Sequence, residues 1–159
     1  MSEDEFEPHP NRGFNPSSEQ IVEQLRDHIE DHRFINELGV SVESYDEGAL
    51  RATVPHQDRY ANPGMEGTLH GGIVVSILDT IMGFTIMAAA AEDSTVDSGP
   101  TINLNVNFLD AVDDDVEAVG EVVHLGSATA VVDGTLREPV SGDIVATGQG
   151  VWRVYQRRD

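Results

Sequence analysis

The sequence contains no cysteine and no lysine. The absence of cysteine excludes a disulfide framework and a thiolate metal site, and it fits a reducing compartment. All nine basic residues are arginine, and they stand against 29 acidic residues, so the formal net charge is −20. A surface this acidic repels nucleic acids and anionic membranes. We therefore predict a cytoplasmic protein with no nucleic-acid partner and no membrane partner.

High acidity without lysine resembles the proteins of archaea that accumulate salt, and an ordinary acidic cytoplasmic protein is the alternative. The same charge opposes the binding of a polyanion unless salt screens the field. The first residues are acidic and lack a hydrophobic run, so no signal peptide is expected. Residues 1–16, with three prolines and little to bury, are predicted to be a disordered arm, and residues 17–159 a single domain.

Ser17 and Gln20 form a predicted capping box, and apolar residues at helical spacing follow, which indicates a helix over about 18–32. His28 and His32 are four residues apart on this helix, as metal ligands can be. Nothing else in the sequence supports a metal. We expect these histidines on a solvated face, and we expect neither a metal nor a cofactor.

Six segments have the composition of strands, and turn-forming residues separate them. Residues 40–45 and 49–54 predict a hairpin around Asp46-Glu47-Gly48. Residues 56–69 form a loop of unusual length, which is typical of a functional segment. Residues 92–99 are predicted to be a polar connection. Further strands are expected at 101–109, 116–124, 128–137 and 144–155.

The strand at 101–109 alternates most regularly. Ile102, Leu104, Val106 and Phe108 are expected on one face, and Thr101, Asn103, Asn105 and Asn107 on the other. The polar face could be solvated or could meet a partner subunit. Both possibilities remain open from the sequence.

The most distinctive stretch runs from 62 to 91, where a Gly- and Pro-rich loop becomes an apolar segment of about five helical turns. A helix that is apolar all round is buried. Its length would allow it to cross a membrane, but its polar residues and acidic flanks favour a core helix. Asp79 is the one formal charge between Glu66 and Glu92. A carboxylate in a dry helix is a site candidate, and a core Asp satisfied by its neighbours is the alternative.

His70-Gly71-Gly72 marks the point where the loop becomes a helix. Unpaired N–H groups and the positive end of the helix dipole gather there, and glycine allows a ligand close to the backbone. Such a site can hold a carbonyl oxygen that gains negative charge. A Gly-Gly turn that merely starts a helix is the other interpretation. Together with Asp79, the motif suggests a carbonyl held at one end and attacked by water or carboxylate.

His70-Gly71-Gly72, Leu78-Asp79 and Gly83 resemble the hotdog-fold acyl-CoA thioesterases, in particular the phenylacetate-degradation type. The segments 99–109, 120–123 and 144–148 resemble the later strands of that family. The resemblance implies an α+β hotdog fold, in which an antiparallel sheet wraps around one long buried helix. It also implies a homodimer or a homotetramer built as a dimer of dimers, with the active site at the subunit interface.

The resemblance further implies roles for individual residues. Asp79 becomes the general base or nucleophile toward the thioester carbonyl, the Gly71 N–H polarises that carbonyl with Gly72 beside it, and Thr101 orients the carboxylate or its water. An ordinary strand residue remains the alternative at Thr101. His70 is expected to brace the loop. Asn62 is the candidate for holding the thioester or water, but it precedes His70 by eight residues instead of about six. Either the loop bulges and keeps Asn62 in place, or that role is lost.

Three functions compete. We favour hydrolysis of an acyl-CoA to free acid and CoA. An enoyl-CoA hydratase or dehydratase needs a close Asp–His pair, which His70 and Asp79 are poorly spaced to form. A non-catalytic acyl-CoA sensor gains nothing from a buried carboxylate. The acyl group is not specified, and six arginines remain equal candidates for the CoA phosphates: Arg51, Arg59, Arg137, Arg153, Arg157 and Arg158.

Overall fold

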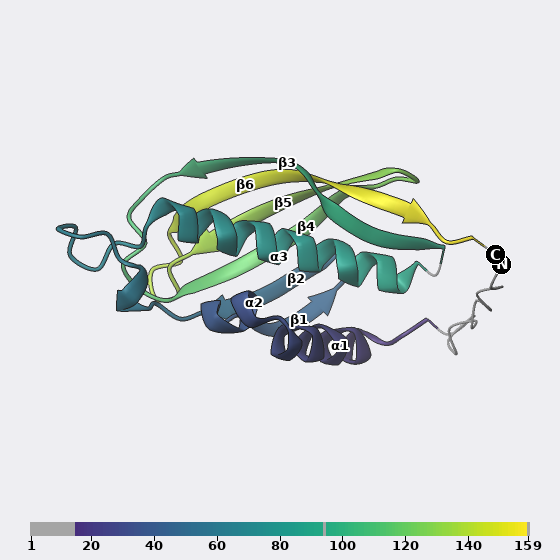
Figure 1. Cartoon of the computed structure of the whole chain (residues 1–159), viewed down its shortest axis with the longest axis horizontal. Helices are drawn as coiled ribbons and strands as arrows, with labels where there is room; N and C mark the ends of the chain where they lie inside the picture. The colour runs from purple at the N-terminus through teal and green to yellow at the C-terminus, as the bar shows by residue number, and fades with distance from the viewer. Residues whose placement is uncertain (1–14, 94, 159) are drawn as a thin grey trace, which may run out of the picture.

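The apolar segment after His70 folds as one helix, α3 (Gly71–Glu92), with eleven buried residues. In the computed structural model, which describes residues 15–93 and 95–158, this helix lies across one face of a curved six-stranded sheet (Figure 1). The predicted core helix is therefore confirmed. Within that described part of the chain, α3 is also the one helix long and apolar enough to cross a membrane, and its burial against the sheet accounts for that composition.

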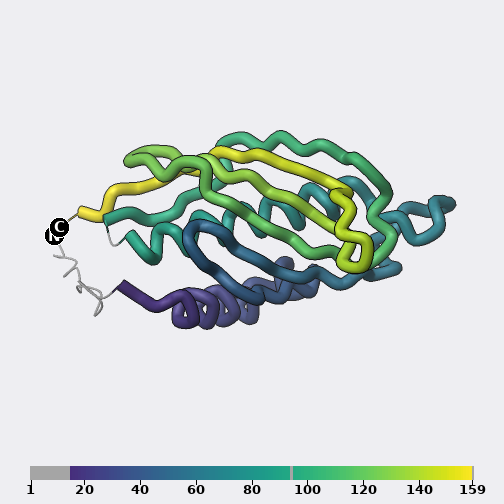
Figure 2. The backbone as a smooth tube through the Cα atoms, turned by 180° about the vertical axis from the view of Figure 1, so that it is seen from behind, coloured from purple at the N-terminus to yellow at the C-terminus, as the bar shows by residue number. Residues whose placement is uncertain are grey.

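The sheet has the strand order β1-β2-β4-β5-β6-β3, and every neighbouring pair is antiparallel. Seen from behind, the strands form one continuous layer with α3 on the far side (Figure 2). This arrangement is the predicted hotdog fold. The strands are β1 (Ser41–Asp46), β2 (Ala49–Val54), β3 (Val96–Phe108), β4 (Val116–Leu125), β5 (Thr129–Arg137) and β6 (Ile144–Gln156).

The polar connection predicted for residues 92–99 is wrong in its second half. β3 begins at Val96, which is buried and pairs with Gln156 of β6. Pairing with a long neighbouring strand therefore extends β3 into a segment whose own composition is polar.

Two short helices precede the sheet, α1 (Ser18–Asp31) and α2 (Arg33–Leu38). The capping box is present, because the Ser17 Oγ accepts from the Gln20 N–H and the Gln20 Oε1 accepts from the Ser17 N–H. α1 packs its apolar face against β1 and α3. Of the predicted disordered arm, residues 1–14 lie outside the described residues.

The hairpin between β1 and β2 has the predicted turn. Glu47 and Gly48 both have positive φ, at 46° and 79°, which matches the right-handed twist of the two strands.

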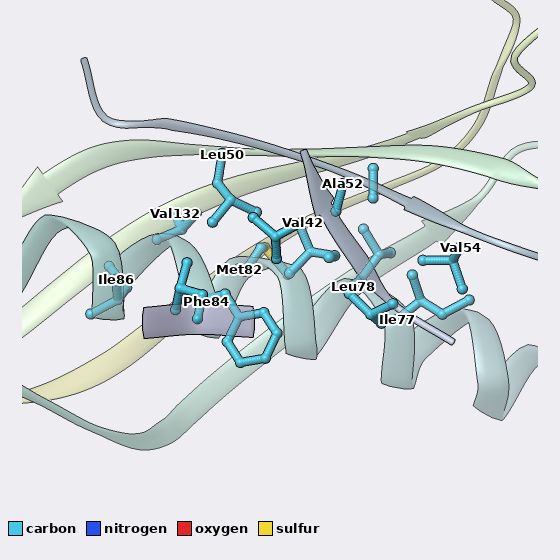
Figure 3. Packing of buried hydrophobic residues seen from close by; sticks show 14 of the residues in the cluster. Val42, Leu50, Ala52, Val54, Ile77, Leu78, Met82, Phe84, Ile86 and Val132 are labelled. Atoms are coloured by element: carbon cyan, nitrogen blue, oxygen red, sulfur yellow. The ribbon is translucent and has the colours of Figure 1, made fainter. Parts of the chain in front are cut away.

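The core lies between α3 and the sheet. Ile77, Leu78, Met82, Phe84 and Ile86 of the helix meet a layer of aliphatic side chains from the strands (Figure 3). The helix comes closest to the sheet over glycines. A Cβ on Gly120 of β4 would lie 2.0 Å from the Thr85 Oγ1, which itself donates to the Ile81 carbonyl oxygen. The layer of strand residues includes Val42, Leu50, Ala52, Val54 and Val132.

We expect Gly120→Ala to lower the free energy of unfolding by roughly 1–3 kcal/mol, because the added methyl group overlaps Thr85 and separates helix from sheet. Gly83→Ala is the matched control, since its Cβ would meet only Trp152 at an ordinary 3.5 Å and alanine favours a helix. Urea denaturation in molar KCl measures both. Equal stability of the two variants would contradict the proposed close packing.

Tyr45 is 2% exposed, and its hydroxyl donates to the Glu92 Oε2 at 2.8 Å. Burial, and then the hydrogen bond and charge of Glu92, raise the pKa of Tyr45. The folded protein thus holds this proton more tightly than the unfolded chain does. The resulting stabilisation is complete below the ordinary tyrosine pKa of about 10 and is lost as the pH rises above it.

Above about pH 10 we therefore expect wild-type stability to fall by up to about 1.4 kcal/mol per pH unit more than that of Tyr45→Phe. The chain has no lysine, so few other side chains titrate in this range. The urea midpoints of both proteins, measured from about pH 8 to about pH 12, test this expectation, because that range spans the ordinary tyrosine pKa of ~10. Parallel curves would show that Tyr45 does not titrate with unfolding.

Candidate active site

The long loop before α3 folds back on itself as a small hairpin. Ala61 and Leu69 form an antiparallel bridge, the Asn62 N–H donates to the Thr68 carbonyl oxygen at 2.8 Å, and the His70 N–H donates to the Tyr60 carbonyl oxygen at 2.8 Å. This hairpin projects from the end of the molecule (Figure 1). The extra residues of the loop therefore lie in the tip of this hairpin. Asn62 pairs with Thr68, two positions along the hairpin from the pair of Tyr60 and His70.

His70 is the N-cap residue of α3. Its Nδ1 accepts a hydrogen bond from the Gly72 N–H at 2.8 Å, which in a neutral ring leaves the proton on Nε2. Gly71 is the first residue of the helix, and Phe108 at the end of β3 lies beside it, 3.4 Å from where a Cβ would stand. His70 thus orders the helix N-terminus, where backbone N–H groups point outward.

Asp79 lies two turns further along α3 and accepts a hydrogen bond from the Thr101 Oγ1 at 2.7 Å. The prediction that Thr101 faces away from Leu104 and Val106 is wrong. The pairing of β3 with β6 shifts register on both sides of Thr101, so that Thr101 lies opposite Trp152 and Leu104 opposite Gly150. This β-bulge turns Thr101 to the helix side of the sheet.

Asp79 opens onto a groove of about 400 Å³, so the prediction of a dry carboxylate is also wrong. α3 covers the sheet with its other faces and leaves the side with Asp79 partly open. The apolar part of its lining comes from Ile35, Phe84, Met87, Pro100 and Trp152. The groove is lined by His28, His32, Ile35, Asp79, Thr80, Gly83, Phe84, Met87, Ser98, Gly99, Pro100, Thr101 and Trp152.

His28 of α1 and His32, the residue between α1 and α2, are solvent-exposed as predicted, but they also line this groove. The His28 ring meets Phe84 edge to face at 5.9 Å and lies 6.0 Å from the His32 ring. The His32 Nδ1 accepts from the Ile35 N–H at the start of α2. In the stretch from 15 to 158, residue 94 excepted, no three His, Asp or Glu side chains gather as a metal site would require.

The predicted site residues fall into two groups within one protomer. Asp79 and Thr101 share the groove, whereas Asn62, His70, Gly71 and Gly72 do not line it. Gly71 and Asp79 are eight residues apart, or about 12 Å along the helix axis. One protomer therefore cannot present both to the same carbonyl group.

Sequence reasoning did not place three residues of this lining at the site. His28 and His32 had a usable signal, their spacing of four residues, but the sequence does not show what that face meets. Trp152 had none, because its position under the groove follows from the pairing of β6 with β3.

Comparison with known proteins identifies the family. The family model of the thioesterase superfamily matches residues 66–142. A protein of Halobacterium salinarum, provisionally named an esterase, is 32% identical over 138 residues, which cover 83% of this chain and 91% of that protein. A thioesterase of Pseudomonas aeruginosa, solved as a mutant, has a TM-score of 0.72 at 25% identity and covers 91% of this chain and 98% of its own.

The PaaI protein of Escherichia coli, from the phenylacetic acid degradation operon, has a TM-score of 0.73 over 89% of this chain and 96% of its own. At 20% identity this likeness concerns the fold alone. The sequence relative and the shared arrangement of α3 and the sheet agree on one assignment. The chain belongs to the thioesterase superfamily and has its hotdog fold.

Proposed function

We propose that the protein hydrolyses the thioester bond of an acyl-CoA to a free acid and CoA. The observation that carries this proposal is the Asp79 carboxylate, hydrogen-bonded to Thr101 at 2.7 Å and open to a partly apolar groove, in a member of the thioesterase superfamily. The groove would take the acyl group and bring its carbonyl carbon to Asp79. The cytoplasm, where acyl-CoA is used, is the proposed location.

The reaction needs a nucleophile and a stabilised oxyanion. Asp79 either removes a proton from water as the water oxygen bonds to the carbonyl carbon, or bonds to that carbon itself and is released by water in a second step. In both cases the carbon–sulfur bond breaks and the CoA thiolate takes up a proton. The Thr101 hydroxyl donates to one oxygen of the Asp79 carboxylate, and the other oxygen would act on the water or on the carbonyl carbon. Neither route calls for a metal or a cofactor.

The oxyanion would be held by the Gly71 N–H at the positive end of α3, with His70 and Gly72 shaping that end. Asn62, two ladder positions away on the loop hairpin, would hold the thioester or the water. From the separation of about 12 Å between Gly71 and Asp79 along the helix axis, we infer that these groups act together only when they come from two subunits. β3 is an edge strand of thirteen residues with Ile102 56% and Phe108 57% exposed. A long exposed edge strand presents unpaired backbone N–H and C=O groups, which invite pairing with another copy.

Twofold pairing of β3 with the β3 of a second copy would cover the exposed edge strand and would bring a second α3 helix close to the first. Two edge strands related by a twofold axis run antiparallel, so their α3 helices also run in opposite directions. The N-terminus of one helix then lies beside the middle of the other. We propose a homodimer, alone or in a dimer of dimers, in which the Gly71 N–H of one subunit serves the Asp79 of the other.

The first test is hydrolysis of a panel of acyl-CoAs in molar KCl, followed by thiol release. We expect Asp79→Asn to lower kcat by about 10²–10⁴-fold, because the proton acceptor or nucleophile is lost. Thr101→Ala should lower kcat less, and Thr101→Ser, which keeps the hydroxyl, should restore most of it. Wild-type activity in Asp79→Asn, with an unchanged oligomer, would exclude the proposed role of this residue.

A complementation assay tests the site between subunits. Gly71→Pro removes one N–H at a helix position that tolerates proline, and His70 already has the extended backbone that a following proline requires (ψ 136°). We expect a 10²–10³-fold loss of kcat. Gly71→Ala, which keeps the N–H, is the matched control.

Neither Gly71→Pro nor Asp79→Asn alone should be active, but refolded mixtures should be. Random pairing makes half of the dimers mixed, and each mixed dimer has one intact site of two, which predicts about a quarter of wild-type activity. Activity no higher than the average of the two variants would place both roles in one subunit.

A further inference from the structure

Trp152 of β6 lies at the floor of the groove described above. It is 3% exposed, and its six-membered ring covers Gly150, where a Cβ would stand 2.3 Å from the ring. Its Nε1 points to Gly83 of α3, where a Cβ would stand 3.5 Å away. The missing side chains at these two glycines therefore create the space that the indole fills and the opening above its nitrogen.

The Trp152 Nε1–H is a hydrogen-bond donor with no acceptor in residues 15–93 and 95–158. The same residues contain no fully buried side-chain nitrogen or oxygen that lacks a partner. The indole nitrogen must therefore be the part of this buried side chain that reaches open space, and both Trp152 and Gly83 line the groove. Indole N–H groups of buried tryptophans normally have a partner. Here the partner has to come from whatever enters the groove.

The position of this donor relative to Asp79 defines what it could bind. Gly83 follows Asp79 by one helical turn on the same side of α3, so the indole nitrogen lies at a level about 6 Å further along the helix axis. The surroundings at that level are mainly apolar, with Phe84 on the helix and the His28 ring against it. An alkyl chain fits this wall but leaves the N–H unpaired.

We propose that Trp152 is a specificity-determining residue that donates a hydrogen bond to an oxygen of the acyl group. The substrates would be acyl-CoAs with an oxo or hydroxyl oxygen roughly four or five bonds of ~1.5 Å beyond the thioester carbonyl carbon. This inference rests on the proposed thioesterase function and adds the chemical class of the acyl group. An unpaired donor discriminates against the plain alkyl group, because the donor then loses its bond to water without replacement.

The test compares hexanoyl-CoA with 5-oxohexanoyl-CoA, which differ in one acceptor oxygen. We expect kcat/KM of the wild type to favour the oxo substrate by about three- to tenfold, the range for one neutral hydrogen bond. Trp152→Phe removes the N–H and should bring this ratio close to one. Gly83→Ala should do the same by a different route, since its methyl group covers the N–H at an ordinary contact distance and leaves the indole in place. Agreement of the two variants excludes a mere packing effect of Trp152→Phe.

Tyr155→Phe is the matched control, because Tyr155 is an exposed aromatic residue on the opposite face of the same strand. Its ratio should equal that of the wild type. A wild-type ratio near one, or a ratio that survives in both Trp152→Phe and Gly83→Ala, would overturn the inference while leaving thioester hydrolysis established.

A binding measurement decides the point without catalysis. Trp152 is the one tryptophan of the chain, so intrinsic fluorescence reports on this indole alone. We would titrate non-hydrolysable thioether analogues of the same two acyl-CoAs. The oxo analogue should bind three- to tenfold more tightly, and Gly83→Ala should remove the difference. Equal affinities would overturn the inference even if no acyl-CoA were hydrolysed, so the two proposals fail separately.

Discussion

The burial of α3 is the constraint on which the rest of this structure depends. The helix is apolar on nearly all sides, so it must be enclosed by protein, and one antiparallel sheet curves around it. Glycines on the facing strands let the helix approach closely enough to exclude water, as at Gly120 beneath Thr85. The side of α3 that carries Asp79 is only partly covered, and the groove forms there between α3, the edge of the sheet at β3 and β6, and α1.

A single helix thus supplies both kinds of group that acyl transfer uses, but at two different places. Its N-terminus presents backbone N–H groups ordered by His70, and its middle presents a carboxylate ordered by Thr101. The rise of an α-helix separates them by about 12 Å, which a rigid helix cannot shorten. In the proposed dimer, the long and exposed edge strand β3 brings two such helices together.

The electrostatics of the chain run against its proposed substrate. A protein with a formal charge of −20 repels the phosphates of CoA, and the described part of the groove is lined by no arginine. Affinity must then come from the acyl group, the carbonyl contacts and the neutral arm of CoA, at an ionic strength high enough to screen the surface. Under the proposed function, substrate choice would then depend largely on the groove lining, which includes the indole of Trp152.

The sequence by itself determined the elements whose signals are local. The capping box at Ser17, the turn at Glu47-Gly48, the core helix and most strand positions could be predicted, because periods of 3.6 and 2 residues and turn chemistry depend only on near neighbours. The lone charge at Asp79 marked this residue as a site candidate, but the sequence did not show that it lines an open groove. Only the tertiary structure decided where β3 starts and which way Thr101 faces, because strand pairing and a bulge set both. It likewise brought His28 and Trp152 to one groove, since residues so far apart in the chain meet through packing that no local pattern records.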